Sequence, residues 1–187
     1  MKKHVSRCLA FLLVGSVLAI GSHARAAAGS FQEDWLGQLG DVEKKLMSLE
    51  EATPQNKMTW RPDKGVRSFS EVYLHTAFGD YLFLTFLGME APADAGFPGE
   101  PGTWDKKTTD KAEIKKTMEK AFAFVRASVK AMPDADLDKK IKLFGKFDMT
   151  ERAALIGLIG HLNEHMGQLV GYARMNKITP PWSKTGA

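Results

Sequence analysis

The sequence predicts an all-α protein folded as a four-helix bundle. Four segments place apolar residues at steps of three and four, whereas no segment of useful length alternates polar and apolar residues as a half-buried strand does. The segment 89–109 is rich in proline and glycine and is long enough to cross the length of a bundle. Such a crossover would leave the second and third helices parallel, so we expect an up-down-down-up arrangement.

The segment 1–26 has the features of a secretory signal peptide. Three basic residues precede an apolar run at 9–20, and Ala24-Arg25-Ala26 supplies a small-x-small cleavage pattern. The run is too short to cross a bilayer, and no second stretch of membrane length follows. We therefore expect an exported protein, periplasmic or secreted, with no stable membrane insertion once the signal is removed. The alternative is an uncleaved membrane anchor.

The mature domain, 27–187, is close to electrically neutral. The chain has 26 Lys and Arg against 22 Asp and Glu, and four of the basic residues but none of the acidic ones lie in 1–26. No remaining segment gathers Lys and Arg beside aromatic residues on one face, so a nucleic-acid partner is not expected. The only cysteine, Cys8, also lies in the signal, which leaves the domain without a disulfide or a thiol nucleophile.

The first helix is expected from about Phe31 to Glu51. Its apolar stripe buries one face and comprises Phe31, Trp35, Leu39, Val42, Leu46 and Leu49. The second helix is expected from Ser68, whose spacing to Glu71 fits a capping box, to Gly88. Because this segment is apolar almost all round, it should be the most buried helix of the bundle.

The third and fourth helices also carry start and stop signals. The third opens near Asp110, with Glu113 three residues later, and ends before Pro133. The fourth begins at 148–150 and runs to about Asn176, ahead of Pro180-Pro181. No internal repeat or linker divides the chain, so one domain is expected.

The three histidines of the mature domain are candidate metal ligands. His161 and His165 are four residues apart on a helix, so they project from one face about one turn apart. A buried histidine pair without partners carries a desolvation cost, whereas one divalent ion can use both ring nitrogens. Alternatively, each histidine hydrogen-bonds a neighbour. His75 lies inside the most apolar helix, where a lone histidine is poorly accommodated, and a shared ion would account for all three.

The segment His161 to His165 also matches a metallopeptidase pattern, HxxEH, in which Glu164 would be a general base. That pattern needs a further acidic ligand downstream, but no Asp or Glu follows Glu164. A peptidase is therefore disfavoured. We expect Glu164 to lie on the surface and to pair with Lys or Arg one turn away.

Several motifs make the chain resemble the DinB-like family of metal-binding four-helix bundles. They are Trp60-Arg61-Pro62, the run from Arg67 to His75, and the run from Gly160 to Gln168 that continues through Tyr172 to Pro180-Pro181-Trp182. The resemblance covers essentially the whole mature domain. It implies an up-down-down-up bundle whose second helix supplies one histidine and whose fourth supplies two to zinc, nickel or another divalent ion. It also implies a possible homodimer, since family members are frequently dimers, and the characterised ones include thiol-dependent transferases and proposed hydrolases.

Two functions remain open from the sequence. In the first, three neutral imidazoles leave a coordination position open, and the protein is a metal-dependent hydrolase or group transferase acting on an unknown small molecule. In the second, it binds a metal or small ligand without catalysis. Gln168 and Tyr172 share the histidine face and either orient a substrate or line a pocket wall. No catalytic residue is assigned.

Overall fold

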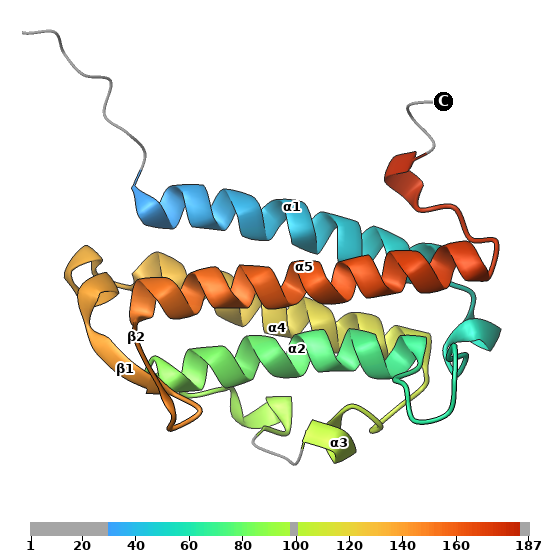
Figure 1. Cartoon of the computed structure of the whole chain (residues 1–187), viewed down its shortest axis with the longest axis horizontal. Coiled ribbons are helices and arrows are strands. Elements are labelled where there is room, and N and C mark those ends of the chain that lie inside the picture. The colour runs from blue at the N-terminus through green and yellow to red at the C-terminus, as the bar shows by residue number, and fades with distance from the viewer. Residues whose placement is uncertain (1–29, 98–100, 184–187) are drawn as a thin grey trace, which may run out of the picture.

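The computed structural model describes residues 30–97 and 101–183, and the expected signal peptide lies outside them (Figure 1). Four long helices form the body of the molecule, and a short helix and a two-stranded hairpin lie in the connections. The elements are α1 (Phe31–Ala52), α2 (Phe69–Phe86), α3 (Pro101–Trp104), α4 (Lys111–Ala131), β1 (Lys140–Leu143), β2 (Phe147–Thr150) and α5 (Glu151–Met175).

The four long helices follow the predicted up-down-down-up order. α2 runs antiparallel to α1, and the chain then returns across the bundle so that α4 runs in the same direction as α2 (Figure 1). α5 completes the bundle parallel to α1. This order confirms both the bundle and its long crossover, and it places α2 between α4 and α5, with contacts to both.

Each long helix begins at a capping residue, and those of α2, α4 and α5 lie where the sequence predicts them. Ser30 and Ser68 form complete capping boxes with Glu33 and Glu71. Asp110 and Thr150 each accept a hydrogen bond from the backbone N–H three residues later. Such a cap stabilises a helix by about 1 kcal/mol, so the starts of α1, α2, α4 and α5 are encoded locally.

The core lies between the long helices and extends over the outer side of α2. On α1 the predicted stripe is buried from Trp35 to Leu49, while Phe31 is half-buried. α2 is buried on almost every side, as expected, because the crossover covers the face that α4 and α5 leave open. The Trp104 ring of α3 lies 5.7 Å from that of Phe78 between centroids. The crossover is thus packed against the bundle.

The hairpin of β1 and β2 was not expected from the sequence, which predicted no strand between the end of the third helix, before Pro133, and the start of the fourth. Lys140 pairs with Thr150, and Leu143 pairs with Phe147 in an antiparallel register. Each strand has four residues, and of these only Leu143 is buried. Strands this short, with few buried side chains, leave no periodic signal in the sequence.

None of the helices in the described part of the chain combines the length and apolar character needed to cross a membrane.

Candidate metal centre

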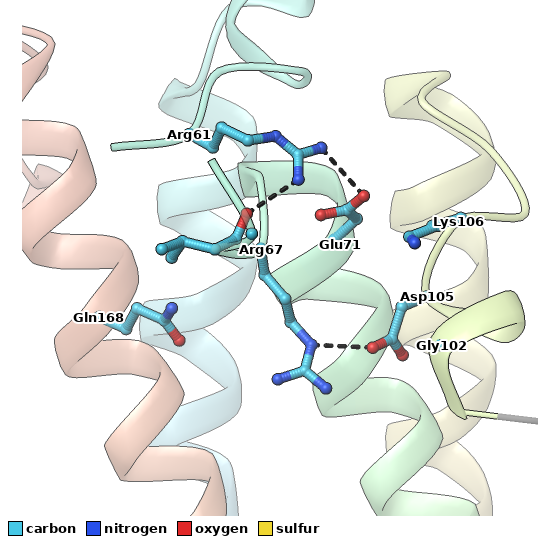
Figure 2. Close-up of a pocket in the computed structure, with 9 residues that line it drawn as sticks. Arg61, Arg67, Glu71, Gly102, Asp105, Lys106 and Gln168 are labelled. Carbon is cyan, nitrogen blue, oxygen red and sulfur yellow. Dashed lines mark hydrogen bonds and ion pairs between the residues drawn. The ribbon is translucent and has the colours of Figure 1, made fainter. Parts of the chain in front are cut away.

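A pocket of about 550 Å³ opens between the start of α2, the crossover and α5 (Figure 2). Polar and charged side chains dominate its wall, including Arg67, Asp105 and Gln168. Two of these residues, Asp105 and Gln168, also contact the histidine cluster described next. These two residues therefore lie between the pocket and the cluster, and none of the described histidines lines the pocket itself.

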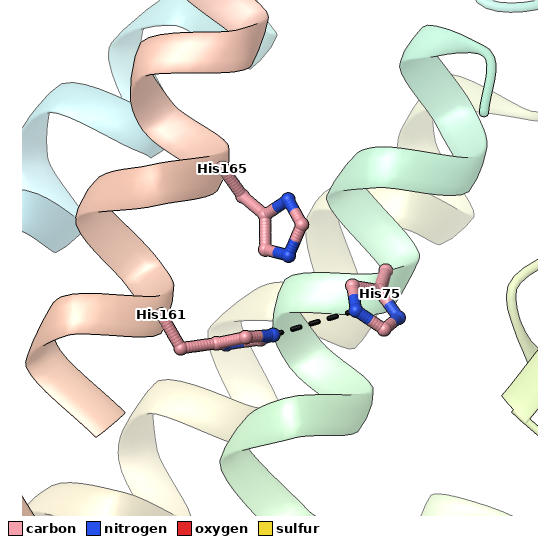
Figure 3. A group of neighbouring side chains, drawn as sticks. All are labelled: His75, His161 and His165. Atoms are coloured by element: carbon pink, nitrogen blue, oxygen red, sulfur yellow. Dashed lines mark hydrogen bonds between the residues drawn. The ribbon is translucent and has the colours of Figure 1, made fainter. Parts of the chain in front are cut away.

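The three histidines come together between α2 and α5 (Figure 3). His75 extends from α2, and His161 and His165 extend from consecutive turns of α5. Their candidate ligand atoms all lie within 4.8 Å of one another, and the Nε2 atoms of His75 and His161 are 3.4 Å apart. The geometry therefore permits a shared ion. That these residues bind a metal stays a prediction.

Gly79 makes room for His161. Gly79 lies one helical turn after His75 on α2, and a Cβ built at this position would be 2.3 Å from Cε1 of His161. Real Cβ atoms do not approach other heavy atoms so closely, so any larger residue would displace the imidazole. The lack of a side chain at 79 lets the His161 ring lie against the backbone of α2.

Burial keeps two of the imidazoles neutral. Burial, followed by the nearby His165 and His75, lowers the pKa of His161 to about 3. Burial also lowers the pKa of His165 from its ordinary value. A neutral imidazole is the form that binds a metal. Both side chains are therefore in the ligating form near neutral pH.

A chain of hydrogen bonds fixes the orientation of His165. The hydroxyl of Tyr172 donates to the carbonyl oxygen of Arg67 (3.0 Å), so the same hydroxyl accepts from Nε2 of Gln168 (2.8 Å). Oε1 of Gln168 then faces Nδ1 of His165 at 2.9 Å and can only accept, which places the proton on Nδ1. This tautomer leaves the lone pair on Nε2 of His165 free for an ion.

Asp105 lies behind His75. One of its carboxylate oxygens, Oδ2, is 3.2 Å from Nδ1 of His75 and accepts a hydrogen bond from Nε of Arg67 at 2.8 Å. The carboxylate and the imidazole are close enough to pair, although Nδ1 is not aligned for a hydrogen bond. Asp105 is only 2% exposed. A carboxylate near the outer nitrogen of a ligating histidine is typical of metal sites.

Asp105 could not be predicted from the sequence. The residue lies in the irregular crossover, where no periodicity relates it to the helices, so the sequence holds no local signal for its contact with His75. Its neighbour Trp104, a large apolar residue in a polar segment, is the only indication that this part of the crossover is packed.

The cluster is suited to a divalent ion that prefers nitrogen ligands. Tetrahedral zinc with Zn–N distances of about 2.0–2.1 Å holds its nitrogen ligands about 3.3–3.4 Å apart, which agrees with the 3.4 Å between His75 and His161. A three-histidine donor set also leaves one coordination position for another molecule. Zinc and nickel both accept imidazole ligands, so three histidines do not distinguish one ion from the other.

Of the other residues singled out in the sequence, Gln168 and Tyr172 lie beside the cluster, whereas Glu164 lies on the surface. Gln168 and Tyr172 hold His165 through hydrogen bonds, and Gln168 also lines the pocket. Glu164 is exposed, as expected, but it joins none of the ion pairs found among the described residues. The expected pairing of Glu164 with a neighbouring Lys or Arg was therefore wrong.

Known families and solved structures that are similar to the chain are DinB-like. The sequence model of the DinB superfamily matches residues 38–169. No protein in the curated collection matches the chain. The chain is similar to the crystal structure of a DinB-like protein from Bacillus cereus, with a TM-score of 0.68 and 20% identity over 80% of this chain and 95% of the other.

Two structures from Bacillus subtilis are also similar. YfiT, described as a probable metal-dependent hydrolase with an unusual four-helix bundle topology, has a TM-score of 0.64 and 19% identity over 86% of this chain and 97% of its own. The DinB-like protein YjoA has a TM-score of 0.61 and 17% identity over 78% of this chain and 94% of its own. At these identities the likeness shows a common fold.

Proposed function

Because the chain belongs to the DinB superfamily, we propose that it is a metal-dependent hydrolase or group transferase whose ion, zinc or nickel, is bound by His75, His161 and His165. The observation that carries this proposal is the convergence of three imidazoles from two helices on one point beside an open pocket. The description of the similar YfiT as a probable metal-dependent hydrolase agrees with the proposal.

A divalent ion at this site would supply a Lewis acid that polarises a substrate carbonyl or activates water or a thiol. The protein's own part is to position the imidazoles. Gln168 holds the proton on Nδ1 of His165, Gly79 admits His161, and Asp105 lies at the outer nitrogen of His75. The pocket shares Asp105 and Gln168 with the cluster and would hold a small molecule beside the histidines.

Metal titration of the purified protein without a histidine tag tests the proposal. We expect one zinc or nickel ion per chain. Replacing any one histidine by alanine should weaken binding by at least roughly a hundredfold, because a site with two remaining imidazoles loses its chelate geometry. Glu164→Ala is the matched control on the same turn of α5 and should leave the affinity unchanged. Undiminished binding in His75→Ala would refute the site.

Turnover separates an enzyme from the alternative, a non-catalytic metal or ligand binder. The metal-loaded protein is screened against esters, amides and thiol-transfer substrates, with His161→Ala as the blank. Activity that follows metal content supports the enzyme. Tight metal binding with no turnover in such a screen favours the binder.

We also propose that the protein is exported, on the strength of the signal-like segment 1–26 alone. Mass spectrometry of the protein recovered outside the cytoplasm should give a chain that begins close to Ala27. A retained segment 1–26 would favour the alternative, an uncleaved membrane anchor.

A further inference from the structure

The pocket beside the histidines contains positive charge that the protein does not neutralise. Three cations and two carboxylates line it, together with uncharged residues; the charged residues are Arg61, Arg67, Lys106, Glu71 and Asp105. The balance is one positive charge in a cavity of about 550 Å³, a volume within the range of small-molecule sites.

Arg61 and Arg67 differ in how many of their hydrogen-bond donors are used. Arg61 donates to the carbonyl oxygen of Val66 at 2.8 Å and to Glu71 at 3.0 Å, which ties it into the wall (Figure 2). Arg67 uses only Nε, which donates to Asp105. In the described part of the chain no group accepts from its two terminal nitrogens, and Figure 2 shows them pointing away from Asp105. This free pair of donors is suited to an anion.

Lys106 is a second available cation on the same pocket. It directly follows Asp105, and its side chain is exposed. Among residues 30–97 and 101–183 it forms no ion pair and no side-chain hydrogen bond. The planar fork of an arginine and the point charge of a lysine together are typical of sites that bind carboxylate or phosphate groups.

The guanidinium of Arg67 lies close to the histidine cluster. The same oxygen of Asp105 contacts both Nε of Arg67 (2.8 Å) and Nδ1 of His75 (3.2 Å), so these two side chains are separated by a single atom. Gln168 connects the pocket to His165 in the same way, since it both lines the pocket and bonds Nδ1 of His165. An anion on Arg67 would therefore lie next to the reacting centre.

We propose that Arg67 and Lys106 bind the oxyanion group, carboxylate or phosphate, of an anionic substrate whose reacting part lies at the three histidines. This substrate class rests on the proposed function, because the histidine site must supply the chemistry. Asp105 has a positioning role, since its bond to Nε holds the guanidinium with its terminal nitrogens free. Arg61 and Glu71 neutralise each other and form the wall.

Binding of small probes by calorimetry tests the proposal. Metal-free and zinc-loaded protein are titrated with succinate, with inorganic phosphate and with the neutral analogue succinamide. We expect one of the two anions to bind and succinamide not to. The anion that binds more tightly identifies the substrate's group as carboxylate or phosphate. Arg67→Gln should weaken anion binding at least roughly tenfold and Lys106→Gln several-fold, as for the loss of charge-assisted hydrogen bonds.

The controls separate lost recognition from lost folding. Lys146→Gln removes one exposed positive charge from the hairpin turn, at the far end of the bundle from the start of α2 (Figure 1), and should not change anion binding. Arg67→Lys keeps the charge but lacks the fork and should bind less well than the wild type. Lys106 has no partner to lose, so Lys106→Gln tests the pocket without disturbing an ion pair.

The outcomes distinguish this inference from the proposed function. Anion binding that depends on Arg67 in a protein that binds no metal would support the pocket and refute the metal site. Metal binding with no anion binding, or with equal anion binding in Arg67→Gln and wild type, would refute the pocket and leave the metal site standing.

Discussion

At the scale of single residues, the histidine cluster depends on a glycine, a residue without a side chain, at position 79. His161 can lie against α2 only because residue 79 is glycine. The three histidines could be predicted from the sequence, because each falls on an inward face of a regular helix. The need for glycine at 79 could not, because it arises from the approach of α5 to α2 and not from either helix alone.

Gly79→Ala should therefore weaken metal binding. The added methyl group would lie 2.3 Å from Cε1 of His161 and force the ring out of position. We expect at least roughly a tenfold loss of zinc affinity, together with about 1–3 kcal/mol of lost stability from overpacking. Zinc titration and urea unfolding measure the two effects. Gly160→Ala is the control, because a Cβ at 160 meets no atom within 4 Å. Equal zinc affinity in both variants would contradict this account of the site.

Glu50 should make stability depend on pH. Its side chain is fully buried without a hydrogen-bond partner, and burial raises its pKa from 4.5 to about 7. Between these values the folded protein holds a proton that the unfolded chain releases, so the free energy of unfolding falls as pH rises from 4.5 to 7. Glu50→Gln removes this pH-dependent loss of stability. It should raise the free energy of unfolding by on the order of 2–3 kcal/mol above pH 7.

Urea unfolding of wild type and Glu50→Gln at pH 4.5 and pH 7.5 measures this effect. The two proteins should differ more at the higher pH. Glu51→Gln is the matched control, since Glu51 is the exposed neighbour on the same helix. A difference between wild type and Glu50→Gln that does not grow with pH would show that Glu50 is not protonated in the folded state.

At the scale of elements, the long helices and the connections differ in how far the sequence determines them. α1, α2, α4 and α5 combine a local capping signal with an apolar stripe, so their limits could be predicted closely. The hairpin and the course of 87–110 are set by packing onto helices that lie far away in the sequence. For this reason the histidines were predicted, while Asp105, which the crossover brings beside His75, was not.

Asp105→Asn tests what the crossover contributes to the site. The change keeps the shape of the side chain but removes the charge beside His75 and Arg67. We expect metal affinity to fall roughly 10- to 100-fold, as for the loss of a carboxylate behind a ligating histidine. Asp94→Asn is the control, because Asp94 also lies in the crossover and pairs with a cation, Lys120, away from the histidines. Equal zinc affinities of the two variants would show that Asp105 does not contribute to the site.

At the scale of the whole molecule, the proposed ion would join two helices that are distant in the chain. α2 would supply one ligand and α5 two, and both helices belong to the central core. A ligand that binds only the folded state stabilises it by about 2.7 kcal/mol when its concentration is a hundred times its Kd. Metal binding should therefore be visible in global unfolding.

Removal of the metal should lower the thermal midpoint by several degrees, about 2–4 °C for each 1 kcal/mol in a domain of this size. Calorimetric scans with saturating zinc and with a chelator measure the shift. His165→Ala provides the control, since its midpoint should be the same under both conditions. If zinc and chelator give the same midpoint in the wild type, the metal does not bind the folded state.

The crossover has a further consequence for how such a protein can change over evolutionary time. The candidate ligands lie on two long helices of the core, whereas Lys106 and Gly102, on the pocket wall, belong to the connection between α2 and α4. Connecting segments accept substitutions and insertions more readily than the elements they connect. Mutations in this segment away from Asp105 would therefore change which substrate a descendant protein binds while leaving the three histidines in place.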